Sequence, residues 1–131
     1  MKKNLLISTG GTGGHVIPAL TFYDHLKNHF NVSISTDQRG TKFINDTYFY
    51  DVIYTPKINS NLFLYPIKFF LLFITIVKSL LFLKKKKINL VLSTGGYMSF
   101  PMCISAKLLG IDIILFEPNT IIGRTNLFIL K

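Results

Sequence analysis

The 131-residue chain is long enough for one domain with its own hydrophobic core and too short for two domains of ordinary size. Hydrophobic residues make up 49% of the chain, which excludes intrinsic disorder because enough apolar surface can be buried to offset the loss of chain entropy. The net charge of +9 favours anionic partners such as phosphates, nucleic acid or an acidic lipid surface, although a general lysine bias would give the same balance.

Strand and helix patterns alternate from the N-terminus, which is typical of a parallel sheet covered by helices. The unbroken apolar run at 4–8 predicts a first strand that is buried on both faces. Apolar residues then recur at helical spacing, so a first helix is expected from Gly14 to about His29. Further strands are expected at 32–36 and 51–55, with a polar loop and a short helix between them.

The segment at 62–83 is almost entirely apolar, is long enough to cross a bilayer, and is followed by four lysines at 84–87. On a helical wheel, one side of this segment and its flanks carries a polar stripe: Asn61, Tyr65, Lys68, Thr75, Ser79 and Lys86. Two central lysines disfavour a helix that spans the membrane. The pattern therefore favours a helix at the membrane surface, with a buried domain helix and a true span as the alternatives.

The second half of the chain repeats the alternation. A strand is expected at 89–94, a helix at 99–109 that ends before Gly110, and a last strand at 112–116. Another helix begins shortly before Lys131. Because a helix of one or two turns buries little surface, we expect a truncated product, a fragment, or a half that works with a second chain.

Two glycine turns share the string Ser-Thr-Gly-Gly: STGGTGGH at 8–15 and STGGYMS at 93–99. Glycines permit positive φ and a close approach of backbone N–H groups to a ligand, and the following helix N-terminus favours negative charge. Both turns follow strands, and ligands bind at the carboxyl ends of strands in such sheets. The turns therefore predict a phosphate or diphosphate site. Neither turn is followed by Lys-Ser or Lys-Thr, so a P-loop is not supported.

His15 directly follows the first glycine turn, where its imidazole could take a proton from an attacking hydroxyl. A capping or packing role is the alternative. Glu117 and Asn119 follow the last predicted strand and are expected at the same edge of the sheet, where they could bind substrate hydroxyls. His25 and His29 have a spacing that can bind zinc, but no third ligand is evident, so they are expected to be exposed.

A dinucleotide fingerprint is an alternative interpretation of the first turn. Gly11 and Gly13 fit its first two positions, whereas Val16 occupies the third. Asp37 ends the second predicted strand, where such folds place an acidic residue that binds ribose. A fragment of a nicotinamide-dependent oxidoreductase therefore remains open.

Three separated motifs resemble the N-terminal domain of the MurG family of peptidoglycan N-acetylglucosaminyltransferases: GGTGGHVIPAL, STGGYMSFP and LLGIDIILFEPNTIIGRTN. The resemblance implies an α/β fold, a Rossmann-like parallel sheet with helices on both faces, which forms the N-terminal half of a GT-B glycosyltransferase over residues 1–131. It implies transfer of GlcNAc from UDP-GlcNAc to lipid I, the polyprenyl diphosphate-linked acceptor, to give lipid II. No metal, cofactor or nucleic acid is implied.

The resemblance also assigns site residues by position. His15 and Glu117 match catalytic positions. The matching substrate-binding positions are Thr12, Gly13, Gly14, Asn119, Gly95, Gly96 and Tyr97. The family's HEQN-like motif reads FEPN here, so Phe116 and Pro118 depart from the pattern.

The family resemblance further implies a peripheral position on the inner face of the cytoplasmic membrane, reached through the stretch from Leu62 to Lys87. The family's donor-binding C-terminal domain has no counterpart in these 131 residues, so the chain alone is expected to have little or no activity. A separate C-terminal half is one possible partner. The alternative is a non-catalytic membrane-anchor subunit of a split GlcNAc transferase.

Overall fold

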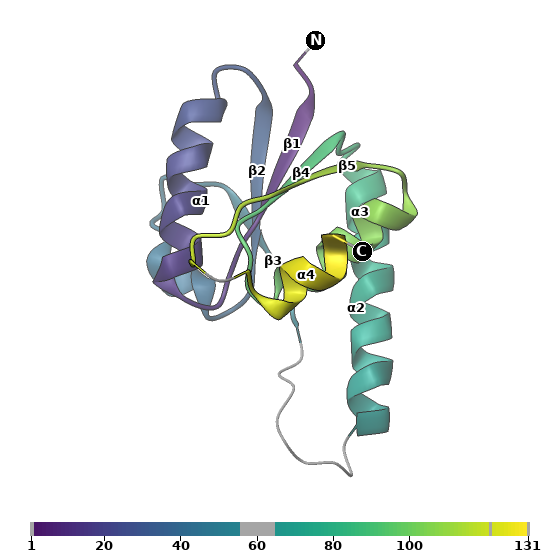
Figure 1. Ribbon diagram of the computed structural model, residues 1–131. Helices are drawn as coiled ribbons and strands as arrows, with labels where there is room; N and C mark the ends of the chain where they lie inside the picture. The colour runs from purple at the N-terminus through teal and green to yellow at the C-terminus, as the bar shows by residue number, and fades with distance from the viewer. Residues whose placement is uncertain (1, 56–64, 121, 131) are drawn as a thin grey trace.

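The computed structural model describes residues 2–55, 65–120 and 122–130. Its centre is a sheet of five parallel strands in the order β3-β2-β1-β4-β5 (Figure 1). The strands are β1 (Asn4–Ser8), β2 (Asn31–Thr36), β3 (Tyr50–Val52), β4 (Leu90–Ser93) and β5 (Asp112–Leu115). The strand order reverses between β1 and β4, which is where open sheets of this kind bind their ligands.

Helices cover both faces of the sheet because neighbouring strand residues point to opposite sides. Leu5 and Ile7 of β1 pack with α1 (Gly13–Leu26), whereas Leu6 packs with α2 (Tyr65–Lys85) and α3 (Ser99–Leu108). A short 3-10 helix, η1 (Gly40–Phe43), follows β2, and α4 (Arg124–Leu130) packs on α3. The predicted Rossmann-like architecture is confirmed.

The predicted elements differ from the observed ones mainly at their ends. The first helix ends at Leu26 rather than near His29, because the amides of His29 and Phe30 turn back to the Leu26 carbonyl and lead the chain into β2. The third strand is shorter than expected, with only Tyr50–Val52 paired to β2. The start of the expected apolar helix at 62–64, and Asn61 of its polar stripe, lie outside the described residues.

The polar stripe predicted for α2 does not mark its solvent side. Thr75 and Ser79 are 4% and 0% exposed and lie against the body of the domain. The Thr75 hydroxyl is satisfied within the helix, donating to the Leu71 carbonyl at 2.9 Å. On the facing helix, the Ser105 hydroxyl lies 2.9 Å from the Ile76 carbonyl oxygen. The Ser105 hydroxyl therefore joins α3 to α2, and at Thr75 and Ser79 the polar stripe of the helical wheel coincides with the buried side of α2.

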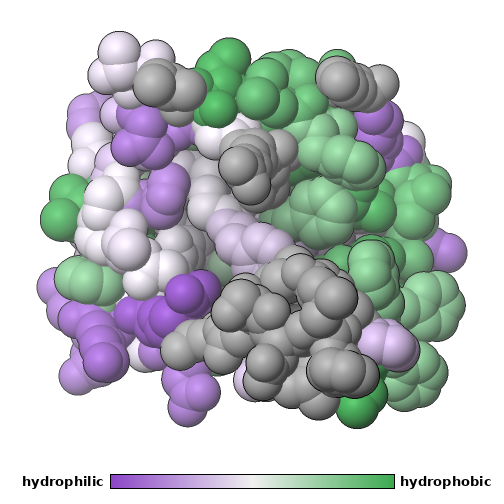
Figure 2. Space-filling model, turned by 60° about the horizontal axis from the view of Figure 1, so that its bottom comes forward, coloured by the Kyte–Doolittle hydropathy of each residue, from purple (hydrophilic) through white to green (hydrophobic). Residues whose placement is uncertain are grey.

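The outward side of α2 is strongly apolar instead. We call it the α2 outer face, and its most exposed members are Ile67, Phe69, Phe70, Phe73 and Leu81. The helix extends beyond the end of the sheet (Figure 1), and Figure 2 shows hydrophobic side chains gathered on that side of the molecule. By length and composition alone, α2 could cross a membrane from Pro66 to Lys85, and it is the one such helix among the described residues.

Candidate active site

The two Ser-Thr-Gly-Gly strings lie side by side at the ends of adjacent strands. Ser8 is paired with Ser93 in the β1–β4 ladder, and the Thr94 amide donates to the Ser8 carbonyl at 3.1 Å. One residue further on, the Thr94 hydroxyl donates to the Thr9 hydroxyl at 2.8 Å. The shared string therefore corresponds to two matching turns that meet at the switch point of the sheet.

His15 connects these two turns. It lies in the first turn of α1, and its Nδ1 is 2.8 Å from the carbonyl oxygen of Thr94. A carbonyl oxygen can only accept, so Nδ1 carries the proton in this contact. In the neutral ring, Nε2 is then the unprotonated nitrogen and can act as a base. The sequence predicted that His15 lies at the carboxyl ends of the strands, as observed. It did not predict the contact with Thr94 that fixes the tautomer of the ring.

The second glycine turn is packed directly against the His15 ring. Gly95 and Gly96 have φ of +87° and +86°, a conformation that favours glycine. A Cβ atom on Gly95 would lie 3.4 Å from His15 Cε1, and one on Gly96 would lie 3.2 Å from the Gly10 carbonyl oxygen. The two glycines therefore allow the turn to approach both the imidazole and the first turn.

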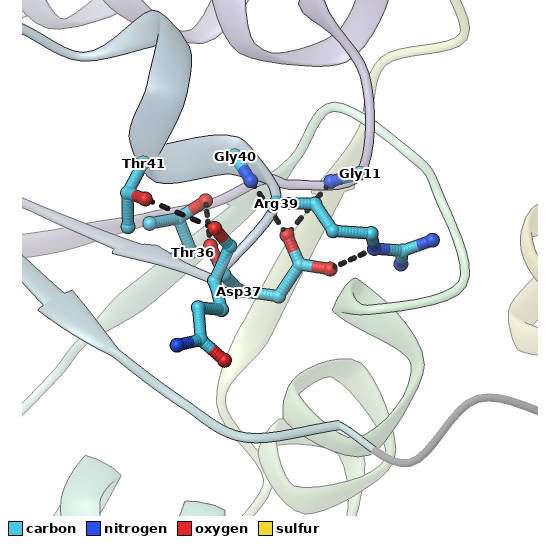
Figure 3. Close-up of polar contacts among 7 residues, drawn as sticks. Gly11, Thr36, Asp37, Arg39, Gly40 and Thr41 are labelled. Atoms are coloured by element: carbon cyan, nitrogen blue, oxygen red, sulfur yellow. Dashed lines mark hydrogen bonds and ion pairs between the residues drawn. The ribbon is translucent and has the colours of Figure 1, made fainter.

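Asp37 holds the first glycine turn from the other side (Figure 3). Its Oδ1 accepts the amides of Gly11 and Gly40, each at 2.9 Å, and its Oδ2 accepts Arg39 Nε at 2.7 Å. Burial opposes ionisation of this carboxyl, but these three donors outweigh it and hold the pKa of Asp37 below its usual value. The carboxylate is 4% exposed and anchors the loop, so the expectation of a ribose-binding Asp37 finds no support in its contacts.

Glu117 organises the loop that follows β5. Its Oε2 accepts the Gly123 amide at 2.8 Å and Asn126 Nδ2 at 3.0 Å, while its Oε1 accepts Asn119 Nδ2 at 2.8 Å. The Gly123 amide, followed by the Asn119 and Asn126 donors, lowers the pKa of Glu117. Asn126 is 2% exposed and lies against Gly95, so Glu117 reaches the His15 region through Asn126.

The remaining predicted residues differ in their exposure. Thr12 and Gly14 are exposed, and Gly13 is half-buried, all at the start of α1. The Tyr97 hydroxyl is buried with no hydrogen-bond partner among the described residues, and burial raises the pKa of Tyr97. This hydroxyl is therefore not presented to solvent. Asn119 is exposed.

The two histidines His25, in the last turn of α1, and His29, just after that helix, are not part of the site. His25 and His29 are both exposed, as expected, and His25 Nδ1 lies 2.8 Å from the Thr21 carbonyl oxygen of its own helix. Within the described ranges, no group of three or more His, Cys, Asp or Glu side chains is placed to hold a metal ion.

Two site residues, Arg39 and Asn126, were not predicted from the sequence. Arg39 lies two positions after Asp37 and could have been suspected from that spacing, since both residues follow a strand end. Asn126 carries no local signal, because its partners Glu117 and Gly95 are distant in the sequence.

Comparison with known proteins matches the sequence of this chain to one family. The sequence profile of the glycosyltransferase family 28 N-terminal domain matches residues 5–131. A UDP-N-acetylglucosamine–N-acetylmuramyl-(pentapeptide) pyrophosphoryl-undecaprenol N-acetylglucosamine transferase from Pelagibacter ubique is 48% identical over 132 residues, which cover 100% of this chain and 37% of that protein. The protein of the same name from the Wolbachia of Culex pipiens is 40% identical over 128 residues, covering 97% and 35% of the two chains.

Among solved structures, Acinetobacter baumannii MurG superposes with a TM-score of 0.83 at 26% identity, covering 98% of this chain and 39% of that one. The glycotransferase of kitacinnamycin, at 16% identity and a TM-score of 0.62, shares the fold alone. The chain thus spans little more than a third of the length of the two curated relatives, 37% and 35%.

Proposed function

The chain belongs to the glycosyltransferase family 28 N-terminal domains, and we propose that it is the acceptor- and membrane-side half of an enzyme that transfers GlcNAc from UDP-GlcNAc to lipid I, giving lipid II. The observation that carries the proposal is the 48% identity to the Pelagibacter ubique transferase over the whole chain. In this proposal, residues 1–131 form the N-terminal domain, and a donor-binding domain is supplied by another segment or a separate chain.

His15 is the proposed catalytic base. The acceptor hydroxyl attacks the anomeric carbon of GlcNAc, the bond from that carbon to the diphosphate breaks, and UDP leaves with the electron pair. Nε2 takes the proton of the attacking hydroxyl, while the Nδ1 contact with Thr94 keeps the ring in the basic tautomer. The 2.8 Å length of that contact supports this role.

The two glycine turns are proposed to bind diphosphate. The amides of Gly13 and Gly14 begin α1 and donate no hydrogen bond to a described residue, as is usual for the first turn of a helix. Such amides favour anions. Gly95, Gly96 and the backbone of Tyr97 would line the other side, next to His15.

Glu117 is proposed to act as a positioning residue rather than at the reacting atoms. Both of its oxygens accept hydrogen bonds from its own loop, and one partner, Asn126, contacts the second glycine turn. Asn119 donates its Nδ2 to Glu117, which leaves the side-chain amide oxygen of Asn119 to accept a hydrogen bond from the substrate.

The α2 outer face is proposed to dock on the inner face of the cytoplasmic membrane, so that the protein is peripheral. Three phenylalanines on it, Phe69, Phe70 and Phe73, are 66%, 64% and 62% exposed. The helix ends in Lys84 and Lys85, which suit an anionic surface. An apolar face beside a basic helix end is the pattern of interfacial helices.

Replacing Phe69, Phe70 and Phe73 together with serine is expected to weaken binding of the chain to vesicles of anionic phospholipid by about 100-fold or more, since each ring loses its apolar burial in the bilayer. Co-sedimentation with the vesicles measures this. Phe49→Ser is the control, because Phe49 is 85% exposed but lies outside α2. The preceding residue, Tyr48, packs on Tyr23 of α1 with ring centroids 5.2 Å apart, on the opposite side of the sheet. Equal binding by the triple variant and the unchanged chain would refute docking through this face.

The whole proposal is tested with a chimera in which residues 1–131 replace the matching N-terminal region of the Pelagibacter ubique relative. The chimera supplies the donor domain from a protein that is 48% identical over the replaced region, so the contacts between the domains have a close template. GlcNAc transfer from UDP-GlcNAc to lipid I is the measurement.

A further inference from the structure

Arg39 is tied to the first glycine turn through one carboxylate. It follows β2, and its Nε donates to Asp37 Oδ2 at 2.7 Å. The other oxygen of the same carboxylate accepts the Gly11 amide at 2.9 Å. The backbone of the turn and the guanidinium are therefore held in a fixed relation by Asp37, as Figure 3 shows.

The terminal nitrogens of Arg39 remain available. They donate no hydrogen bond to any described residue, and in Figure 3 they point away from the Asp37 carboxylate. The side chain is 45% exposed, so a ligand can reach them. A Cβ atom on Gly11 would lie 3.8 Å from Nη2, which places the end of the guanidinium against the turn itself.

The surroundings of this guanidinium favour an anion with more than one oxygen. A guanidinium presents paired N–H donors that match phosphate oxygens, which a single ammonium cannot do. The first turn of α1 contains no acidic residue, and Thr12 makes no capping hydrogen bond with its side chain. The carboxylate that contacts the guanidinium is that of Asp37, and its charge is already balanced by Arg39 Nε and by the amides of Gly11 and Gly40.

We propose that Arg39 binds a diphosphate at the first glycine turn, with Asp37 as the residue that positions it. The proposal rests on the function proposed above, which supplies two sources of this group: the UDP-sugar donor and the polyprenyl diphosphate acceptor.

The test uses the 131-residue chain and two probes: UDP and geranyl diphosphate. Affinities come from calorimetry, and the amide signals of Gly11 and Gly13 in NMR spectra locate the ligand. Arg39→Gln is expected to weaken binding of a diphosphate about tenfold or more, because charge-assisted hydrogen bonds are lost. Arg39→Lys should recover only part of the loss. Lys42→Gln removes the same charge from an exposed side chain of η1 and should leave the affinity for both diphosphates unchanged.

A loss confined to UDP assigns Arg39 to the donor, and a loss confined to geranyl diphosphate assigns it to the acceptor. Equal affinities of Arg39→Gln and the unchanged chain for both diphosphates overturn the proposal, as does the absence of binding to the unchanged chain. The readout is independent of GlcNAc transfer. An active chimera together with unaffected binding by Arg39→Gln would remove the role of Arg39 and leave the proposed function standing.

Discussion

His15→Ala is expected to slow GlcNAc transfer by the chimera about 100- to 10,000-fold, the usual contribution of a general base. The ring nitrogen Nδ1 is committed to the Thr94 carbonyl at 2.8 Å, so Nε2 is the nitrogen that can accept the proton of the acceptor hydroxyl. Initial rates at saturating UDP-GlcNAc and lipid I measure the effect on the chemical step rather than on binding.

A structural role for His15 would give a different pattern, which a second variant distinguishes. Asparagine at position 15 retains an N–H donor for the Thr94 carbonyl but has no basic nitrogen. If His15 is the base, His15→Asn is as slow as His15→Ala. Recovery of the rate in His15→Asn would instead show that His15 acts only through its hydrogen bond to the Thr94 carbonyl and not as the base. His25→Ala is the control, because His25 is exposed and bonds only within α1.

Asp37→Ala is expected to lower the free energy of unfolding of the chain by about 3 kcal/mol. Asp37 is 4% exposed, and its carboxylate is the acceptor of the Gly11 amide, which loses its partner in the variant. The Gly40 amide loses one of its two acceptors and keeps the backbone carbonyl of residue 37 at 3.0 Å. Urea unfolding followed by circular dichroism measures the change. Asp24→Ala is the matched control and should have a much smaller effect, because Asp24 forms an exposed ion pair with Lys27. Equal effects of the two substitutions would contradict the anchoring role.

The same carboxyl gives stability a predictable dependence on pH. The folded-state pKa of Asp37 lies below its ordinary value, so the ionised form favours folding. Its contribution is complete above the unfolded-state pKa of about 3.9 and is lost as the pH falls through the lower folded-state pKa. The difference in unfolding free energy between the unchanged chain and Asp37→Ala should therefore shrink below about pH 4. A difference that stays constant from pH 5 to pH 3 would show that Asp37 does not titrate with folding.

The sheet and the two glycine turns were predictable because their signals are local. Apolar runs of strand length, followed by glycines with positive φ at Gly95 and Gly96, identify both the strands and the point where they end. Parallel alternation then places His15 and Glu117 at one edge of the sheet. These features depend on a few neighbouring residues, and the structure confirms the strands and the adjacent turns.

The orientation of α2 could not be read from its own pattern. A helical wheel shows that Thr75 and Ser79 share a side, but not whether that side meets water or another helix. The answer depends on what α2 packs against, which includes α3, where the Ser105 hydroxyl lies 2.9 Å from the Ile76 carbonyl oxygen. Small hydroxyl residues were therefore buried while three phenylalanines remained outside.

The roles of Asp37 and Glu117 depended on contacts that the sequence does not encode locally. Asp37 follows a strand end, as a ribose-binding residue would, yet it accepts the Gly11 amide from a turn 26 residues away. Glu117 binds Asn126, which lies nine residues further along the chain and against the second turn. Each carboxylate is thereby used to build the site, which position along the sequence alone does not distinguish from substrate binding.

GlcNAc transfer by the chimera decides whether residues 1–131 can serve as the N-terminal half of such a transferase. The measurement is the formation of lipid II from UDP-GlcNAc and lipid I, with the full Pelagibacter ubique relative as the positive control and the 131-residue chain alone as the negative control. Lipid II is expected from the chimera and from the relative, and little or none from the chain alone. A chimera that unfolds cooperatively and binds UDP-GlcNAc, yet forms no lipid II while the relative does, would contradict this expectation.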